Sequence, residues 1–156
     1  TDRVVQKGDI IQFDIGCKVN GYCSDFSRVV FVEEMKEEYK TVYDFVLGEQ
    51  KRLEAALKDG ANIKTVIKDR ETEYRLKNYA IMHAFGHGVG LNIHEAPILR
   101  STIDCTLKEN SVIAVEPGVY LPGKYGIRIE DTYRVTKTGC QNLTTSDKDY
   151  TIIKLS

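Results

Sequence analysis

The beginning of the chain shows the two-residue hydrophobic period of β-strands. Residues 9–17 read DIIQFDIGC, and one face of a strand there would carry Ile11, Phe13 and Ile15. The dipeptide Asn20-Gly21 favours a tight hairpin turn, because both residues tolerate the positive φ angles that such a turn needs. A second strand is predicted over residues 22–32, YCSDFSRVVFV. Together these segments predict an antiparallel β-hairpin.

The hydrophobic period then lengthens to that of an α-helix. Between Glu33 and Lys58, apolar residues recur at steps of three, four or seven, and this stripe consists of Met35, Tyr39, Val42, Val46, Leu53 and Leu57. Gly60 is expected to stop the helix. A second helix is predicted from Asn62, a candidate N-cap, to about Tyr79.

The rest of the chain again favours strands. Within residues 111–121, SVIAVEPGVYL, a buried strand is predicted that Pro117-Gly118 ends. Residues 126–135 alternate between an apolar and a polar side. A turn is predicted at Gly139 and a last short strand over residues 150–154. Strands and helices mix without regular βαβ alternation, so the sequence predicts a single domain of the α+β class over residues 1–156.

The composition narrows the function classes. The 156 residues carry a formal net charge of −1, so the basic excess typical of nucleic-acid binding is missing. No apolar run approaches the length of a membrane-spanning helix, and no signal peptide is recognisable. Four cysteines without CxxC spacing are typical of free thiols in a reducing compartment, and only Cys17 and Cys23 flank a common turn. We therefore expect a cytoplasmic protein that binds neither nucleic acid nor membranes.

Carboxylates occupy strand positions where apolar residues would be expected. A two-residue turn at Asn20-Gly21 would pair Asp14 with Ser27, which places Asp14 and Asp25 on one face within side-chain reach. Two such charges repel each other unless a proton or a cation lies between them. The predicted hairpin therefore indicates a cation or proton site on that face.

Two glutamates and a histidine cluster extend this pattern. Glu116 ends the apolar run VIAVE, and Glu130 lies within IRIED, where an isolated ionised carboxylate is costly to bury. All three histidines of the chain lie in the segment HAFGHGVGLNIHEAP, residues 83–97. Four acids and one imidazole indicate a pair of metal ions, and a ligand set rich in oxygen favours Mn²⁺ over ions that prefer thiolates.

Each of these residues also has a simpler interpretation when taken alone. Asp14 can face water on an edge strand, Asp25 can pair with Arg28, and Glu130 can pair with Arg128 on a solvated face. Glu116 can belong to a turn with Pro117. The GHGVG segment can be a plain turn, whereas a phosphate loop is disfavoured because no Lys-Ser/Thr follows it. The ordered set of Asp, Asp, His, Glu and Glu favours a shared site.

Longer motifs make a family resemblance visible. The stretches DIGCKVNGYCSDFSR, GHGVGLNIHEAP, VEPGVYLPGKYGIRIED and TGCQNLT resemble the C-terminal catalytic domain of the Xaa-Pro peptidases, that is, aminopeptidase P and prolidase of metallopeptidase family M24. The resemblance covers essentially the whole chain and implies the pita-bread form of an α+β fold. It also implies dinuclear metal-dependent hydrolysis of the peptide bond that precedes proline at the N-terminus of peptides.

The resemblance implies a role for each unusual residue. Its metal ligands fall on Asp14, Asp25, His87, Glu116 and Glu130. Asp25 and Glu130 would bridge two divalent ions, with Asp14 on one ion and His87 and Glu116 on the other. Glu116 would also shuttle the proton of the attacking water.

Further roles follow from the same resemblance. His83 and His94 would hydrogen bond to the scissile carbonyl or the tetrahedral intermediate, and Arg128 would orient the glutamate ligands. Mn²⁺ is the expected metal, with Co²⁺ or Zn²⁺ as alternatives. The SDxTRT pattern of the family is here SDFSRVV, in which Ser27 keeps a hydroxyl and Val29 does not; neither position is a metal ligand.

The resemblance also places the chain within a longer domain. In the family, helices, strands and another histidine precede the DIG motif, so we expect residues 1–156 to be the C-terminal portion of a longer parent chain that carries the activity. A homodimer acting on peptides with proline at the second position is implied. The alternatives are a methionine aminopeptidase-like enzyme and a catalytically inactive pita-bread binding module.

Overall fold

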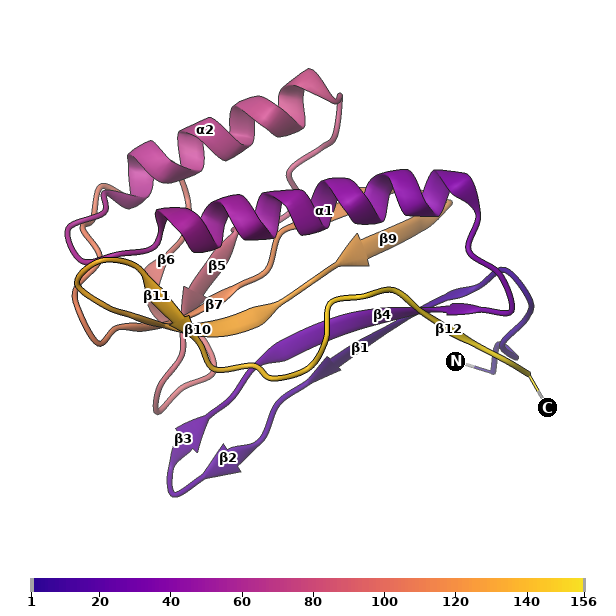
Figure 1. Ribbon diagram of the computed structural model, residues 1–156, viewed down its shortest axis with the longest axis horizontal. Coiled ribbons are helices and arrows are strands. Elements are labelled where there is room, and N and C mark those ends of the chain that lie inside the picture. The colour runs from indigo at the N-terminus through magenta and orange to yellow at the C-terminus, as the bar shows by residue number, and fades with distance from the viewer. Residues whose placement is uncertain (1, 156) are drawn as a thin grey trace.

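A hairpin, two helices and a series of short strands follow one another in the computed structural model, which describes residues 2–155 (Figure 1). The helices are α1 (Glu37–Ala56) and α2 (Ile63–Leu76). The strands are β1 (Ile10–Ile15), β2 (Lys18–Val19), β3 (Tyr22–Cys23), β4 (Phe26–Val32), β5 (Gly86–Gly88), β6 (Glu95–Ile98), β7 (Val112–Val115), β8 (Gly118–Leu121), β9 (Tyr125–Arg128), β10 (Asp131–Val135), β11 (Cys140–Asn142) and β12 (Thr151–Ile153).

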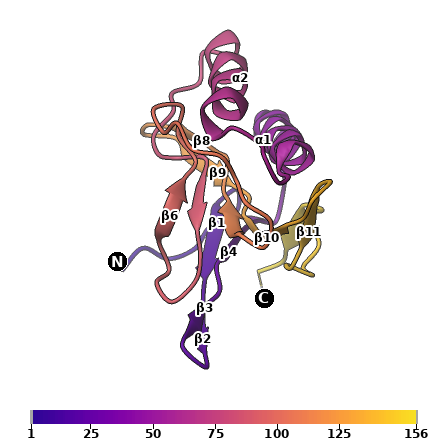
Figure 2. The ribbon, with the colours of Figure 1, turned by 90° about the vertical axis from the view of Figure 1, so that its left-hand side faces the viewer.

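The strands form two principal sheets. One has the order β1-β4-β12, and the other has the order β11-β10-β7-β5-β6. The pairs β2–β3 and β8–β9 are two-stranded hairpins, and a backbone bridge between Ser27 and Glu130 joins the two principal sheets. Both helices lie above the strands in Figure 1, and the view in Figure 2 shows the β2–β3 hairpin protruding on the opposite side.

The structure confirms the predicted hairpin and its register. Asp14 pairs with Ser27, and Val19 pairs with Tyr22. The turn residues Asn20 and Gly21 have φ angles of 51° and 89°, as a turn of this kind requires. The predicted second strand is broken between β3 and β4, and Asp25 lies in that break.

The two predicted helices are present with shorter bounds. Helix α1 begins at Glu37 rather than at Glu33, because Glu33 has a left-handed φ of 66° that a helix does not tolerate. Helix α2 ends at Leu76 rather than near Tyr79, before Asn78 with φ 58°. Asn62 caps α2 as predicted, and its side chain accepts a hydrogen bond from the backbone N–H of Thr65 at 3.1 Å.

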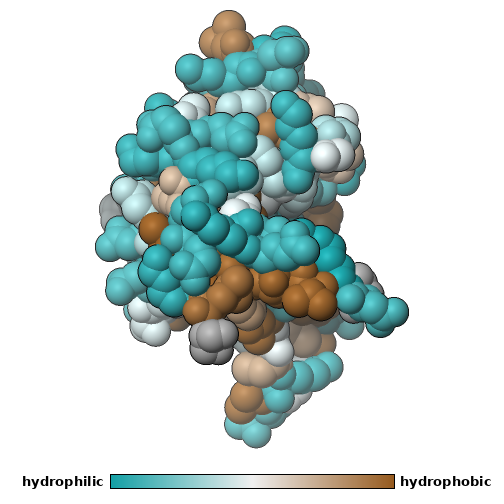
Figure 3. Space-filling model, turned by 90° about the vertical axis from the view of Figure 1, so that its right-hand side faces the viewer, coloured by the Kyte–Doolittle hydropathy of each residue, from teal (hydrophilic) through white to brown (hydrophobic). Residues whose placement is uncertain are grey.

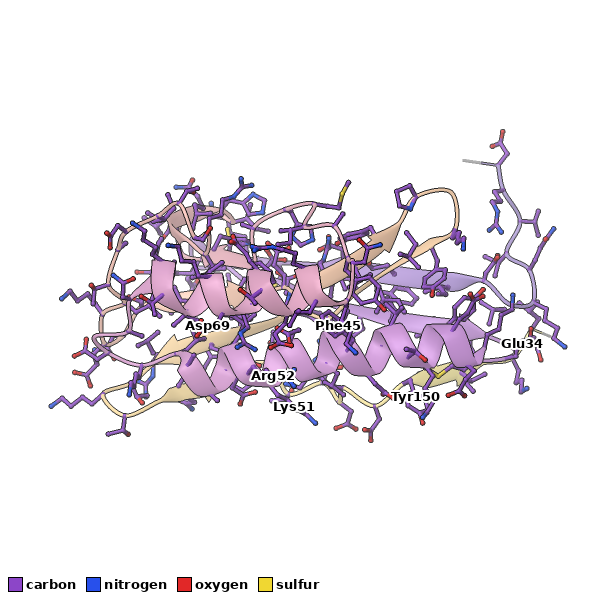
Figure 4. All side chains as sticks on the ribbon, turned by 90° about the horizontal axis from the view of Figure 1, so that it is seen from above. Glu34, Phe45, Lys51, Arg52, Asp69 and Tyr150 are labelled. Carbon is purple, nitrogen blue, oxygen red and sulfur yellow. The ribbon has the colours of Figure 1, made fainter. Side chains whose placement is uncertain are left out.

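The predicted apolar stripe of α1 is buried, and the two helices contact each other through side chains outside that stripe. Figure 4 shows the two helices side by side, with Phe45 between them, and the rings of Phe45 and Tyr74 lie 5.0 Å apart. The buried carboxylate of Glu49 in α1 pairs with Arg52 at 2.7 Å and with Arg70 of α2 at 3.4 Å. None of the helices described in residues 2–155 is long and apolar enough to cross a membrane.

The later strands are more broken than the alternation predicts. Strand β7 ends at Val115, close to the predicted end at Pro117-Gly118, and after the break at Glu116-Pro117 the chain forms a further strand, β8, that was not predicted. The predicted strand over residues 126–135 is divided into β9 and β10 at Ile129-Glu130, and its halves belong to different sheets. Strands β5, β6 and β11 were not predicted. The breaks matter for function, because each one holds a glutamate of the predicted site.

The glycines beside His87 allow strands to approach closely. A Cβ atom on Gly88 would lie 2.4 Å from the backbone oxygen of Ala96, and one on Gly86 would lie 2.1 Å from that of Ala114. Strand β5 can therefore fit between β6 and β7 only because glycine flanks His87 on both sides. The GHG sequence is a tightly packed strand, which corrects the alternative of a plain turn.

Some apolar side chains remain at the surface. Phe13 and Ile15 of β1 are 43% and 50% exposed. Figure 3 shows hydrophobic residues gathered in the lower middle of one face, above the protruding hairpin. All four cysteines are free thiols, as expected.

Candidate metal centre

Side chains from five separate segments line one open cavity of about 360 Å³. Each of the five predicted ligands contributes to it: Asp14 from β1, Asp25 from the break before β4, His87 from β5, Glu116 from the break after β7, and Glu130 from the break before β10. Ile93, His94 and Arg128 complete the lining. The fold thus brings together residues that are far apart in the sequence, and the strand breaks turn both glutamates toward the cavity.

His87 lies between two of the carboxylates. Its Nε2 atom is 3.6 Å from Oδ2 of Asp25 and 3.7 Å from Oε1 of Glu116. Its Nδ1 atom is 3.0 Å from the backbone oxygen of Gly88. A carbonyl oxygen can only accept, so Nδ1 carries the proton and Nε2 presents its lone pair toward the carboxylates. A carbonyl partner on one ring nitrogen is the usual arrangement for a metal-binding histidine.

The ligand atoms form two overlapping groups. One group consists of Asp14, Asp25 and Glu130, and the other of Asp25, His87 and His94; within each, the ligand atoms lie within 4.8 Å of one another. Asp25 is common to both groups. The rings of His87 and His94 are 4.3 Å apart at their centroids. The residues of these two groups would hold a pair of ions, with Asp25 as the residue common to both. Glu116 belongs to neither group, and the second group includes His94, which was predicted only as a substrate-side residue.

Burial makes the carboxylates difficult to ionise. Burial, together with repulsion from the neighbouring Asp25 and Glu116, raises the pKa of Glu130 to about 8. Burial likewise raises the pKa of Glu116 to about 7, against the opposing charge of Arg128, and it raises the pKa of Asp25. Divalent ions would compensate this excess of negative charge, so the donor set fits a pair of metal ions.

Burial also lowers the pKa values of two histidines. The pKa of His87 falls below its usual range, although the carbonyl of Gly88 opposes this effect. The pKa of His83 falls for the same reason, against the carbonyl of Ala84. Both imidazoles are therefore neutral near neutral pH, and a neutral imidazole is the form that binds a metal ion.

Arg128 contacts the carboxylates from one side of the cavity. Its guanidinium donates to the carboxylate of Asp14 and, through Nε, to Oγ of Ser27 at 3.1 Å. The same Nε atom is 3.9 Å from a carboxylate oxygen of both Glu116 and Glu130. Arg128 thus lies against Asp14 as well as against the two glutamates that it is predicted to orient, and this face is buried rather than solvated.

His83 lies beside the same carboxylates. Its Nδ1 atom is 3.8 Å from Oε2 of Glu116 and 2.6 Å from the backbone oxygen of Ala84. Its Nε2 atom is 2.8 Å from the hydroxyl of Tyr120, and that hydroxyl is 3.5 Å from the Arg128 guanidinium. Tyr120 and Ser27 are parts of the site whose contacts the sequence did not reveal, because only the fold places them beside Arg128.

The structure excludes two of the simpler interpretations of the individual residues. Arg28 pairs with Asp131 at 2.6 Å and not with Asp25. The side chain of Glu130 is only 2% exposed, so Glu130 does not belong to a solvated face. Asp14 retains 56% side-chain exposure yet is held by Arg128. The residues therefore form one site rather than five unrelated surface features.

Comparison with known proteins gives a consistent picture. The profile of metallopeptidase family M24 matches residues 1–137. The Xaa-Pro dipeptidase of Pyrococcus furiosus is 38% identical over 152 residues, which cover 96% of this chain and 43% of that enzyme. The chain thus spans less than half of the length of that relative.

Solved structures agree with the sequence comparison. The X-Pro aminopeptidase from Thermotoga maritima superimposes with a TM-score of 0.93 at 39% identity, covering 98% of this chain and 44% of the other. The prolidase from Pyrococcus furiosus gives a TM-score of 0.90 at 36% identity, covering 94% and 44%. These similarities confirm the expected α+β fold of the pita-bread type.

Proposed function

The chain belongs to metallopeptidase family M24, and we propose that its protein is a metalloexopeptidase that cleaves the peptide bond preceding a proline at the second position of a peptide. The observation that supports this most directly is the meeting of Asp14, Asp25, His87, Glu116 and Glu130 around one cavity. The names of the relatives, Xaa-Pro dipeptidase and X-Pro aminopeptidase, support the substrate class.

The five side chains would hold two divalent ions. Bound there, the ions would polarise the scissile carbonyl and make water acidic enough to react near neutral pH. Mn²⁺ is the proposed metal because oxygen donors predominate in the site, with Co²⁺ and Zn²⁺ as alternatives.

The protein's own residues would then direct the proton and the substrate. Glu116 accepts the proton of the attacking water and delivers it to the proline nitrogen as the C–N bond breaks. His94, whose ring lies beside that of His87, would donate to the carbonyl oxygen as negative charge develops on it. His83 would do the same only after its ring gives up the bond to the Ala84 carbonyl or to the Tyr120 hydroxyl.

The setting of the enzyme is part of the same proposal. We propose a cytoplasmic protein, on the basis of its four free thiols, and a homodimer, on the basis of the family resemblance.

Metal content and turnover test the proposal together. The natural polypeptide that carries this sequence is loaded with Mn²⁺, dialysed and analysed for metal. The same polypeptide is assayed on an Xaa-Pro dipeptide, an Xaa-Ala dipeptide and a peptide beginning with Met. We expect about two ions per chain and cleavage of the Xaa-Pro substrate alone. Absence of bound metal would refute the site, and cleavage of the Met peptide would indicate a methionine aminopeptidase instead.

A ligand variant and a matched control test the metal site. Glu130→Gln is expected to lower the metal content. Lys154→Met, at a side chain 73% exposed, serves as the control that leaves both properties unchanged. Metal binding without turnover on any peptide would indicate an inactive binding module.

A further inference from the structure

A buried polar network lies directly behind the metal centre. Its centre is Asp131, which has no exposed surface and follows the ligand Glu130 in the chain. Adjacent residues in an extended chain direct their side chains to opposite sides. Glu130 lines the cavity, and Asp131 is directed into the network behind it.

Two cations converge on Asp131 from different parts of the chain. Arg28 of β4 donates to Oδ1 at 2.6 Å, and Lys148 donates to Oδ2 at 2.5 Å. Asn142 also donates to Oδ2, at 2.9 Å, and the Tyr133 hydroxyl donates to the same atom at 3.2 Å. A carboxylate surrounded by this many donors is held in one orientation.

The guanidinium of Arg28 extends the network to the backbone of the metal site. Its NH1 group donates to the carbonyl of Glu130 at 2.7 Å and to that of Ser27 at 2.9 Å. Ser27 and Glu130 form the backbone bridge between the two sheets. Arg28 therefore fixes the distance between the strand that follows Asp25 and the strand break that holds Glu130.

A hydroxyl supports the same junction on the other ligand. Thr132 donates through Oγ1 to the backbone oxygen of Asp25 at 2.7 Å. Residues 130–132 thus contact residues 25–28 through side chains as well as through the backbone bridge. The relative position of Asp25 and Glu130 depends on these contacts, because the two residues lie in segments that join different sheets.

The C-terminal segment closes the network from outside. Arg28 donates to the carbonyl oxygens of Ser146 and Asp147 at 2.8 and 2.9 Å. The side chain of Lys148 is only 19% exposed, and its backbone oxygen accepts from the Tyr43 hydroxyl of α1 at 2.9 Å. Lys148 is thereby held at Asp131 although it lies in an irregular segment.

We propose that Lys148, with Arg28 and Asp131, positions the ligands Asp25 and Glu130 so that they can share metal ions. Lys148 is a positioning residue that acts through Asp131 and Arg28. The inference rests on the proposed metal site. It means that a residue of the C-terminal segment, outside the set of predicted ligands, contributes to metal affinity.

The affinity for Mn²⁺ of the natural polypeptide that carries this sequence tests the proposal. Binding of Mn²⁺ is measured by competition with a chromophoric chelator for wild type, Lys148→Met and Lys148→Arg. We expect Lys148→Met to bind roughly tenfold more weakly, as for the loss of other groups that orient metal ligands. Lys148→Arg keeps the cation and is expected to bind within about twofold of wild type.

Two control variants separate positioning from general stability. Lys154→Met removes an exposed lysine of the same segment, and Asn62→Ala removes the N-cap of the distant helix α2 and lowers the unfolding temperature. Both are expected to bind Mn²⁺ like wild type. The inference is overturned if Lys148→Met binds within twofold of wild type, or if Asn62→Ala weakens binding equally. Failure of wild type itself to bind metal would instead refute the proposed function, and this inference with it.

Discussion

The Nε2 atom of His87 lies 3.6 Å from Oδ2 of Asp25, while Nδ1 of the same ring is hydrogen bonded to the backbone oxygen of Gly88. The imidazole is therefore fixed with its lone pair directed at the carboxylates. We expect His87→Ala to weaken Mn²⁺ binding by roughly 100-fold or more, since a ligand contributes more than the groups that merely orient it. Calorimetric titration checks this, with the exposed Cys105→Ala as a control. An unchanged dissociation constant in His87→Ala would contradict the site.

Arg128 holds Asp14 and the hydroxyl of Ser27 at the same time. Replacing it by methionine preserves much of the side-chain volume but leaves Asp14 free to turn toward solvent. We expect Arg128→Met to weaken metal binding roughly tenfold. The matched control is Arg134→Met, at an exposed arginine on the adjoining strand. Equal affinities for the two variants would show that Arg128 does not orient the ligands.

The buried glutamates predict how stability depends on pH in chelator-treated protein. The pKa values of Glu130 and Glu116, about 8 and about 7, lie above the ordinary 4.5, so the folded chain binds their protons more tightly than the unfolded chain does. This stabilisation is fully present below about pH 4.5 and is lost as the pH rises through 7 and 8. Because one pKa unit corresponds to about 1.4 kcal/mol, the free energy of unfolding is expected to fall by a few kcal/mol between pH 5 and pH 8.

Urea unfolding at several pH values measures this dependence. Glu130→Gln removes the group with the larger shift and is expected to flatten the curve. A pH dependence equally steep in wild type and in Glu130→Gln would show that the carboxylate of Glu130 is not held in its protonated form by the fold.

Close packing at Gly88 predicts a large effect of a single methyl group. A Cβ there would lie 2.4 Å from the Ala96 carbonyl oxygen, whereas a Cβ on Gly139 would meet nothing within 4 Å. We expect Gly88→Ala to lower the free energy of unfolding by about 2 kcal/mol or more and Gly139→Ala to change it by less than about 0.5 kcal/mol. Chemical denaturation distinguishes them, and similar values for both variants would mean that β5 tolerates a wider spacing.

Local features of the sequence were sufficient for the hairpin and for the helices. The Asn20-Gly21 turn sets the register, so the pairing of Asp14 with Ser27 follows from counting along two adjacent strands. The stripe through Val42, Val46 and Leu53 is buried as predicted. The helix ends differ because single left-handed residues such as Glu33 and Asn78 depend on the packing around them.

The sequence by itself determined which residue types meet at the site, since charged groups in strands need a compensating partner whatever the details of the fold. Only the tertiary structure decided how they meet. Alternation predicted one strand through Ile129-Glu130, but the chain breaks there because its two halves pair with different sheets. The contacts of Arg28 and Lys148 with Asp131 likewise join segments far apart in the chain. Local propensity contains no information about such long-range contacts, because they form only when separate elements pack against one another.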